Sequence, residues 1–275
     1  MKLVLLNAIM ACLLLISSPS LAYEQESENK APPPKAEAGG VTAFLSGQMP
    51  VMAGKEQQLT LRLTDKTGAP LPPERLDVVH TQVVHLLILD QSLSDYQHVH
   101  PRPGKEQGSY SFSFTPKTGH DYRVWVDMTP KGGQQVYIPV SLKGTAACKT
   151  SCVDTKQVLS LRRGGRSFSL SFDRKVRKGI PSMATLSVTD SNGQPVKRLE
   201  PVMGAYAHVV GITETGNGIA HVHPMGEEPA ADTDRGSSPL TFHIEPKQAG
   251  FLKIWAQLVI DGEEIFVPFG IIVGG

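Results

Sequence analysis

Cysteine is scarce in this chain, with 3 among 275 residues. Cys12 lies in the apolar N-terminal segment, so only Cys148 and Cys152 remain for the body of the protein. A thiolate zinc site usually needs a second Cys or His pair close in sequence, and none follows this one. In an oxidising compartment, two cysteines at this spacing are predicted to form a small local disulfide.

The chain also lacks an excess of charge of either sign. Lys and Arg number 27 and Asp and Glu number 26, and no basic run interrupts the sequence. A nucleic acid or an anionic membrane is therefore not expected as a main partner. After the N-terminal segment, no apolar run is long enough to cross a bilayer. A Gly-x-Ser-x-Gly motif is absent, and neither remaining cysteine lies in a repeated position, so nothing supports nucleophilic hydrolysis.

The N-terminal residues have the pattern of a secretory signal. Lys2 is followed by a nearly apolar run, and Ser20-Leu21-Ala22 is a small-x-small cleavage site, which predicts residues 1–22 as a signal peptide cleaved after Ala22. Residues 23–40 are rich in Glu, Lys, Ala, Pro and Gly and are predicted to be a disordered leader. The protein is therefore expected in the periplasm or outside the cell.

A repeat organises the rest of the chain. The segment from His85 to Pro101 returns, without a gap, as the segment from His208 to Pro224. Flanking motifs repeat as well, such as Leu61–Leu71 with Leu186–Val196. The size prior then predicts two domains of about 100 residues. Their expected bounds are 41–143 and 157–275, joined by a linker at 144–156 that contains the cysteine pair.

The expected fold class is all-β. Residues 58–64, 109–114 and 167–172 alternate polar and apolar side chains, which is typical of half-buried antiparallel strands. Val83–Leu89 is a continuous aliphatic run apart from His85, as expected for a central strand. Turn signals recur at short intervals, and no stretch shows helical spacing of apolar residues. This pattern predicts two tandem immunoglobulin-like antiparallel β-sandwiches related by internal duplication.

Histidines are what the two copies share. Only five of the seventeen repeated positions are identical, and three of them are the histidines of a His-x12-His-x-His-Pro pattern. In extended chain, His98 and His100 point to one face about 7 Å apart, and a returning strand can bring His85 beside them. Imidazole is the commonest side-chain ligand of zinc and copper. The predicted metal ligands are His85, His98, His100, His208, His221 and His223.

The alternative is that these histidines are structural, buried in strands or bonded to backbone carbonyls, because a duplication copies structural residues too. The remaining histidines, His80, His120 and His243, have no histidine counterpart in the other copy and are predicted to be ordinary surface or edge residues.

Copper is the expected metal, with zinc as the alternative. All-imidazole sites suit both ions, and Cu(II) binds more tightly at a given nitrogen site. Met225 directly follows the second His-x-His-Pro and is a candidate thioether ligand, which would favour Cu(I). No carboxylate occupies matching places in the two copies, which argues against a carboxylate-rich iron or calcium site.

The first copy also carries a resemblance. The His85 to Pro101 pattern, followed by Gly-Ser-Tyr-x-Phe-x-Phe at 108–114 and Tyr-Arg-Val-Trp-Val at 122–126, resembles the YtkA-like and copper-resistance β-sandwich proteins of the bacterial periplasm. The resemblance covers residues 83–142 best. It implies a protein that holds, buffers or delivers copper outside the cytoplasm, with another periplasmic metal carrier or an efflux component as partner.

Three functions remain open on the sequence. A non-enzymatic metal-binding protein, with one site per domain or a shared site, comes first. A copper-dependent redox enzyme is the second, because three imidazoles leave a coordination position open. A structural or adhesive pair of sandwiches, whose histidines only pack, is the third.

Overall fold

The computed structural model describes residues 34–148 and 152–275. The predicted signal peptide and residues 23–33 of the predicted leader lie outside the described residues. Regular structure in the described part is all β apart from one short 3-10 helix, η1 (Pro73–Arg75). No helix in that part is long and apolar enough to cross a membrane.

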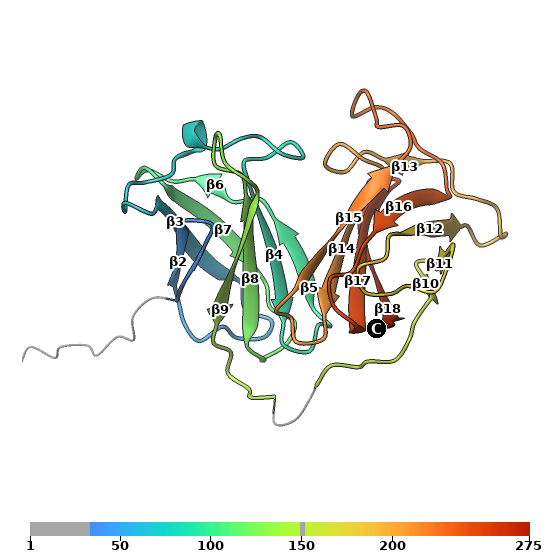
Figure 1. Ribbon diagram of the computed structural model, residues 1–275, viewed down its shortest axis with the longest axis horizontal. Coiled ribbons are helices and arrows are strands. Elements are labelled where there is room, and N and C mark those ends of the chain that lie inside the picture. Colours follow the sequence, from blue (N-terminus) through green and yellow to red (C-terminus); the bar gives the residue numbers. More distant parts are fainter. Residues whose placement is uncertain (1–33, 149–151) are drawn as a thin grey trace, which may run out of the picture. The chain divides into compact units, whose positions relative to one another are not determined.

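The first half of the chain forms two antiparallel sheets (Figure 1). One has the order β1-β2-β3-β7-β6 and the other β5-β4-β8-β9. With β2 as strand A, these are the A-B-E-D and C′-C-F-G sheets of an immunoglobulin-like sandwich. The strands are β1 (Lys35–Ala38), β2 (Val41–Gly47), β3 (Gln57–Asp65), β4 (Val84–Asp90), β5 (Tyr96–Val99), β6 (Arg102–Pro103), β7 (Ser109–Phe114), β8 (Tyr122–Met128) and β9 (Val136–Leu142).

The second half repeats this arrangement within one continuous sheet of order β10-β11-β12-β16-β15-β14-β17, with β13 and β18 both paired to β17. The sheet is continuous because β15 pairs with β14 at one end and with β16 at the other. The strands are β10 (Ser160–Arg163), β11 (Arg166–Phe172), β12 (Ser182–Thr189), β13 (Leu199–Glu200), β14 (His208–Thr213), β15 (Ile219–Met225), β16 (Leu240–Ile244), β17 (Gly250–Ile260) and β18 (Glu263–Val273).

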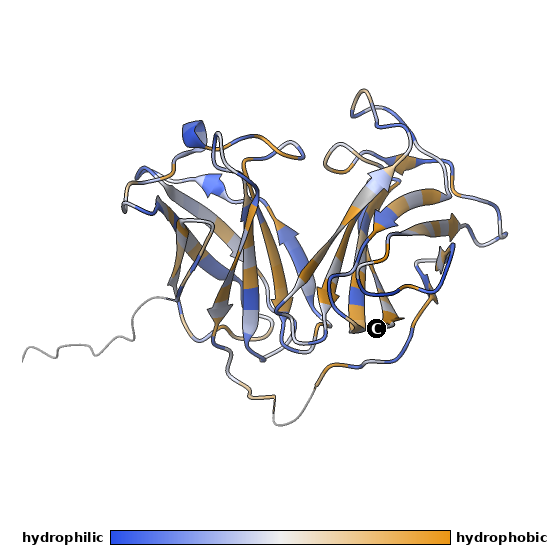
Figure 2. Cartoon of the chain, viewed as in Figure 1, coloured by the Kyte–Doolittle hydropathy of each residue, from blue (hydrophilic) through white to orange (hydrophobic). Residues whose placement is uncertain are grey.

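Each half has its own hydrophobic core. One core is built from side chains between residues 36 and 142, and the other from side chains between 159 and 273. Along many strands hydrophobic and hydrophilic residues alternate, as Figure 2 shows. This alternation points one face inward. The predicted pair of immunoglobulin-like sandwiches related by duplication is thereby confirmed.

Strand β4 is apolar on both faces for a specific reason. Its residues Val84, Leu86 and Ile88 enter the first core. The intervening Leu87 and Leu89 join a third cluster, in which first-half side chains pack against Val210, Ile212 and Trp255 of the second half. The predicted central strand is thus buried between a core and a neighbouring domain, and His85 lies on the side of β4 that faces this third cluster.

The predicted leader ends earlier than expected. Residues 35–38 form β1, whose Lys35 pairs with Phe44 of β2, and Ala36 and Ala38 pack against the first core. The composition of this segment suggested disorder, but backbone pairing to a neighbouring strand does not require large apolar side chains. The prediction that disorder extends to Gly40 is therefore wrong for the described residues.

Candidate metal centre

Two paired strands bring three of the predicted ligands together. His85 lies on β4, His98 lies on the adjacent β5 with Leu87 as its register partner, and His100 follows at the end of β5 before Pro101. His85 Nδ1 is 3.2 Å from His98 Nε2 and 3.1 Å from His100 Nε2. One nitrogen from each ring lies within 4.8 Å of the other two. His85 is 3% exposed, and the other two are half-buried.

The outer nitrogen of His85 fixes which tautomer this ring adopts. Its Nε2 lies 2.8 Å from the carbonyl oxygen of Val79. A carbonyl oxygen only accepts hydrogen bonds, so Nε2 carries the proton and donates it. In the neutral ring Nδ1 therefore presents a lone pair toward His98 and His100.

The second domain fixes the tautomer of His98. His98 Nδ1 lies 3.0 Å from Gln257 Oε1 on β17, and Gln257 Nε2 donates to Glu264 Oε1 at 2.6 Å. A carboxylate accepts only, which orients the amide with its oxygen toward His98. His98 Nδ1 must then donate, and Nε2 presents a lone pair to His85. A hydrogen bond of this kind on the outer nitrogen orients metal-binding histidines.

Burial keeps these rings uncharged. It lowers the pKa of His85 to about 4, with His100 and His80 adding smaller electrostatic effects. Burial, followed by His208 and His85, holds the pKa of His98 well below its ordinary range. Burial also lowers the pKa of His100. At neutral pH the cluster is therefore a set of neutral imidazoles in which the lone pairs of His85 Nδ1 and His98 Nε2 face each other.

The spacing matches a first-row metal ion. Nitrogens about 2.0–2.1 Å from a tetrahedral ion lie about 3.3 Å apart. The distances of 3.1 and 3.2 Å between ring nitrogens are close to this value. The ring centroids of the three histidines are 4.9–5.3 Å apart, close to the roughly 5.2 Å expected of imidazoles that share a tetrahedral ion. The cluster could therefore bind a metal ion.

Imidazoles beyond the triplet extend the cluster. His208 of β14 has its ring centroid 4.9 Å from that of His98. His80 has its centroid 6.3 Å from both His85 and His208. The prediction that His80 is an ordinary surface residue is therefore wrong. His80 precedes His85 by five residues, and extending the repeat by those five residues would have aligned it with Met203.

Two other histidines have different surroundings. His120 Nδ1 lies 2.9 Å from the Asp90 carboxylate, so it stabilises the end of β4. His243 lies on β16, where its register partner is His223.

The second triplet is described only in part. His208 lies opposite Gln257 of β17, as His85 lies opposite Asp127 of β8. His221 and His223 lie on β15, and their side chains are outside the described residues. Met225 ends β15 with 51% of its surface exposed. Metal binding by His208, His221, His223 and Met225 stays a prediction.

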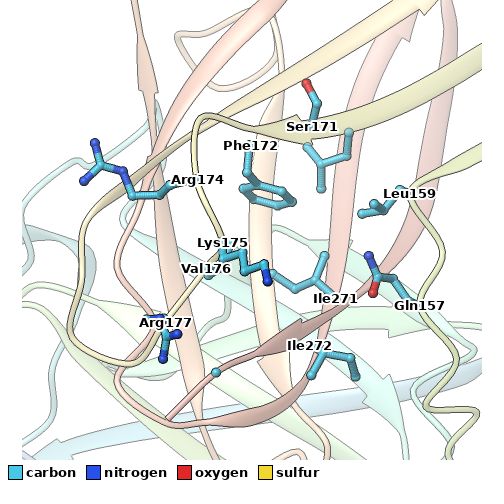
Figure 3. A pocket seen from close by; sticks show the side chains of 12 residues that line it. Gln157, Leu159, Ser171, Phe172, Arg174, Lys175, Val176, Arg177, Ile271 and Ile272 are labelled. Carbon is cyan, nitrogen blue, oxygen red and sulfur yellow. The ribbon is translucent and has the colours of Figure 1, made fainter.

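Two other features do not involve the clustered histidines. Cys148 and Cys152 are joined by a disulfide in the structure. A surface hollow of about 590 Å³ in the second domain has Phe172, Val176 and Ile271 among its apolar lining and Arg174 and Arg177 among its charged residues (Figure 3). None of the clustered histidines lines this hollow.

Comparison with known proteins places the chain in a family without naming a ligand. Residues 36–145 and 162–275 match a domain of unknown function, DUF8832. The chain belongs to the DUF8832 family. No curated protein matches it.

Solved structures similar to the chain include the D00-D0 domain of Intimin and the fibronectin(III)-like modules of Clostridium thermocellum CbhA. The first is 12% identical, covers 85% of this chain and 100% of its own, and has a TM-score of 0.25. The second is 13% identical, covers 84% and 94%, and has a TM-score of 0.21. Likeness at this level says nothing about ligand or activity.

Proposed function

We propose that this protein is a periplasmic or secreted metal-binding protein that holds copper through His85, His98 and His100. The observation that carries the proposal is the convergence of unprotonated nitrogens. The outer nitrogens of His85 and His98 carry the ring protons and donate them in hydrogen bonds to the Val79 carbonyl and to Gln257 Oε1, so the inner nitrogens, 3.2 Å apart, have no proton between them. Facing lone pairs repel, and a cation at their centre replaces that repulsion with two bonds.

The donor set favours copper over zinc. The cluster contains imidazoles and no carboxylate, which suits either ion. Met203, at the tip of the turn before β14, joins the three histidines as a candidate fourth ligand. A thioether is a soft ligand that selects Cu(I) over Zn(II). Zinc is the alternative ion where the protein does not encounter copper.

The role we propose is to hold, buffer or deliver the ion outside the cytoplasm. We propose this role because residues 1–22 are a predicted signal peptide and because the metal site is partly accessible from one side. His98 and His100 are half-buried, whereas His85 is nearly inaccessible. Because Gln257 and His208 of the second domain lie against His98, a partner carrier or efflux component would approach the ion from the side of His100.

A metal titration of the demetallated protein tests this function. Cu(I), under anaerobic conditions, and Zn(II) are titrated against a competing chelator into wild type and into His98→Ala/His100→Ala. Removing two of three imidazoles should lower the affinity of the first domain by at least 100-fold. His120→Ala is the control, because it also removes an imidazole but one bonded to Asp90. Equal affinity in the wild type and the double variant would exclude the proposed site.

A further inference from the structure

The hollow in the second domain lies where strands β11 and β18 end. Its volume is about 590 Å³, and Leu159, Phe172 and Ile271 give it apolar walls (Figure 3). Ile272 also lines it, with 53% of its surface exposed. Small-molecule sites are concave, mostly apolar and about 300–1,000 Å³ in volume. The hollow therefore has the size and the lining of a ligand site.

The duplication identifies the loop of the first domain that corresponds to the loop beside the hollow. In each loop the N–H of a glycine with a positive φ value donates to a proline carbonyl at 2.7 or 2.8 Å, Gly54 to Pro116 and Gly179 to Pro246. The two prolines are equivalent, because each is followed by a lysine and lies nine residues before a tryptophan. The loop at 48–54 therefore matches the loop at 173–179 residue for residue.

The loop beside the hollow carries charges that its counterpart lacks. The positions of Met49, Pro50 and Met52 in the first domain are occupied in the second by Arg174, Lys175 and Arg177, which line the hollow. Phe172 stands in place of Gly47. Ile272 stands in place of Lys143, since each comes four residues after the proline opposite the repeated tryptophan. This end of the second domain therefore combines larger apolar side chains with three cations from the loop.

One of these cations is left without a partner. Arg174 Nε donates to Asp173 Oδ2 at 3.0 Å, and Arg177 Nη1 donates to the carbonyl oxygen of Gly275 at 2.8 Å. The side chain of Lys175 has no hydrogen bond or ion pair with another described residue, and its amine extends toward Ile271 (Figure 3). No Asp or Glu is among the described residues that line the hollow. Its charge is therefore suited to an anion.

We propose that this hollow binds the anion of a fatty acid, with the aliphatic chain against Phe172 and Ile272 and the carboxylate at Lys175. A single unpartnered cation matches the single charge of a carboxylate, whereas a phosphate monoester carries about −1.5 to −2 at neutral pH. None of the clustered histidines lines the hollow. The inference therefore goes beyond the proposed metal-binding function and does not rest on it.

Calorimetric titration of the full chain with sodium octanoate, sodium hexanoate and 1-octanol tests the proposal. Octanoate should bind saturably and more tightly than hexanoate, because each fully buried CH₂ group adds about fourfold in affinity. It should also bind about threefold more tightly than 1-octanol, which has the same chain length without the charge, since an exposed ion pair contributes about that much.

Two variants separate the contribution of the charge from that of the apolar wall. Lys175→Met should weaken octanoate binding about threefold and leave 1-octanol binding unchanged. Ile272→Ser should weaken the binding of both. Lys131→Met is the matched control, because it removes an exposed lysine that does not line the hollow, and it should bind both probes as wild type does. All three side chains are exposed, so the fold should persist.

Three results would overturn the proposal. The first is the lack of saturable octanoate binding in wild type. The second is octanoate binding that both Lys175→Met and Ile272→Ser leave unchanged, because the probe would then lie elsewhere. The third is binding of phosphatidylglycerol vesicles without binding of octanoate, which would identify a membrane surface as the partner.

Discussion

The two domains follow the same chain path but differ where it passes from one sheet to the other. In the first domain, β5 ends at Val99 and β6 begins at Arg102 on the opposite sheet. In the second, β15 runs unbroken from Ile219 to Met225 and pairs with β14 at one end and with β16 at the other. The His-x-His-Pro segment lies at this passage in both copies. The duplication has therefore kept the position of the histidines and changed whether the strand is continuous there.

The residues opposite the leading histidines differ as well. His85 is the register partner of Asp127, whereas His208 is the partner of Gln257. Gln257 bonds to His98 of the other domain, so the second domain orients a histidine of the first. The first centre, built by the first triplet, therefore depends on both domains, although all three of its histidines come from the first domain.

The largest expected effect is a difference between substitutions of His85 and of His208, the first histidines of the two triplets. A metal at about 1,000 times its Kd stabilises a folded protein by about 4 kcal/mol. His85→Ala should abolish the stabilisation that the first ion provides, because both other ligands face His85 Nδ1. His208→Ala should retain it. Urea denaturation with one equivalent of Cu(I) measures the difference, and equal losses in the two variants would contradict a first centre that does not require His208 as a ligand.

The next effect concerns Asp127, the counterpart of Gln257. Burial raises the pKa of Asp127 to about 6. The carboxyl group binds its proton less tightly in the unfolded chain. Its ionisation therefore lowers the free energy of unfolding by about 3 kcal/mol above pH 6 and has no effect below about pH 4. Asp127→Asn makes the position neutral, as in the second domain, and keeps an oxygen for the bond from Gln135. The metal-free variant should therefore be more stable at pH 8.

Urea denaturation of metal-free protein at pH 8 and pH 4 checks this sign. The gain should be present at pH 8 and lost at pH 4. Asp121→Asn is the control, since hydrogen bonds lower the pKa of the exposed Asp121 and its replacement should not stabilise the fold. A gain of the same size at both pH values would show that the ionisation of Asp127 is not its cause.

A smaller effect is expected at the bond between the domains. Gln257→Leu removes the acceptor of His98 Nδ1, and losing such a partner typically costs 10–100-fold in metal affinity. Gln135→Leu changes a glutamine that bonds to Asp127 rather than to a histidine of the triplet, so it should leave metal affinity within about threefold of wild type. Chelator competition measures both affinities. An unchanged affinity in Gln257→Leu would show that the bond from the second domain to His98 does not support metal binding.

The smallest expected effect lies at Tyr96, which aligns with Ile219 of the second copy. Tyr96 stacks on Trp255 with ring centroids 5.5 Å apart, and its buried hydroxyl has no hydrogen-bond partner among the described residues. Tyr96→Phe keeps the stack and removes the unsatisfied hydroxyl, so it should stabilise the protein by about 1 kcal/mol. Thermal unfolding measures this shift, and a destabilised variant would mean that the hydroxyl is hydrogen-bonded in solution.

Local patterns in the sequence were sufficient to predict the fold. The alternation in residues 109–114 and the continuous apolar run at Val83–Leu89 both became strands. The repeat of turn motifs correctly predicted two equivalent sandwiches. β1 was missed because the pairing of Lys35–Ala38 with β2 depends on a neighbouring strand and leaves no mark in the composition.

The candidate site could be predicted only where its residues are close in sequence. His98 and His100 are two residues apart, and the repeat identified His85. Gln257 contacts His98 across 159 positions of sequence, so no local pattern reveals it. His80 was missed for another reason: its counterpart is Met203, and identity between the two copies does not reveal a position where the residues differ.

X-ray absorption of the protein loaded with one equivalent of Cu(I) tests the central claim most directly. We expect three imidazole nitrogens at about 2.0 Å from the ion, with the sulfur of Met203 as an additional, longer contact. The nitrogen signal should fall in His98→Ala/His100→Ala. A first shell of oxygen atoms, or one with fewer than two imidazoles in the wild type, would contradict the claim that the converging lone pairs of His85, His98 and His100 bind the metal.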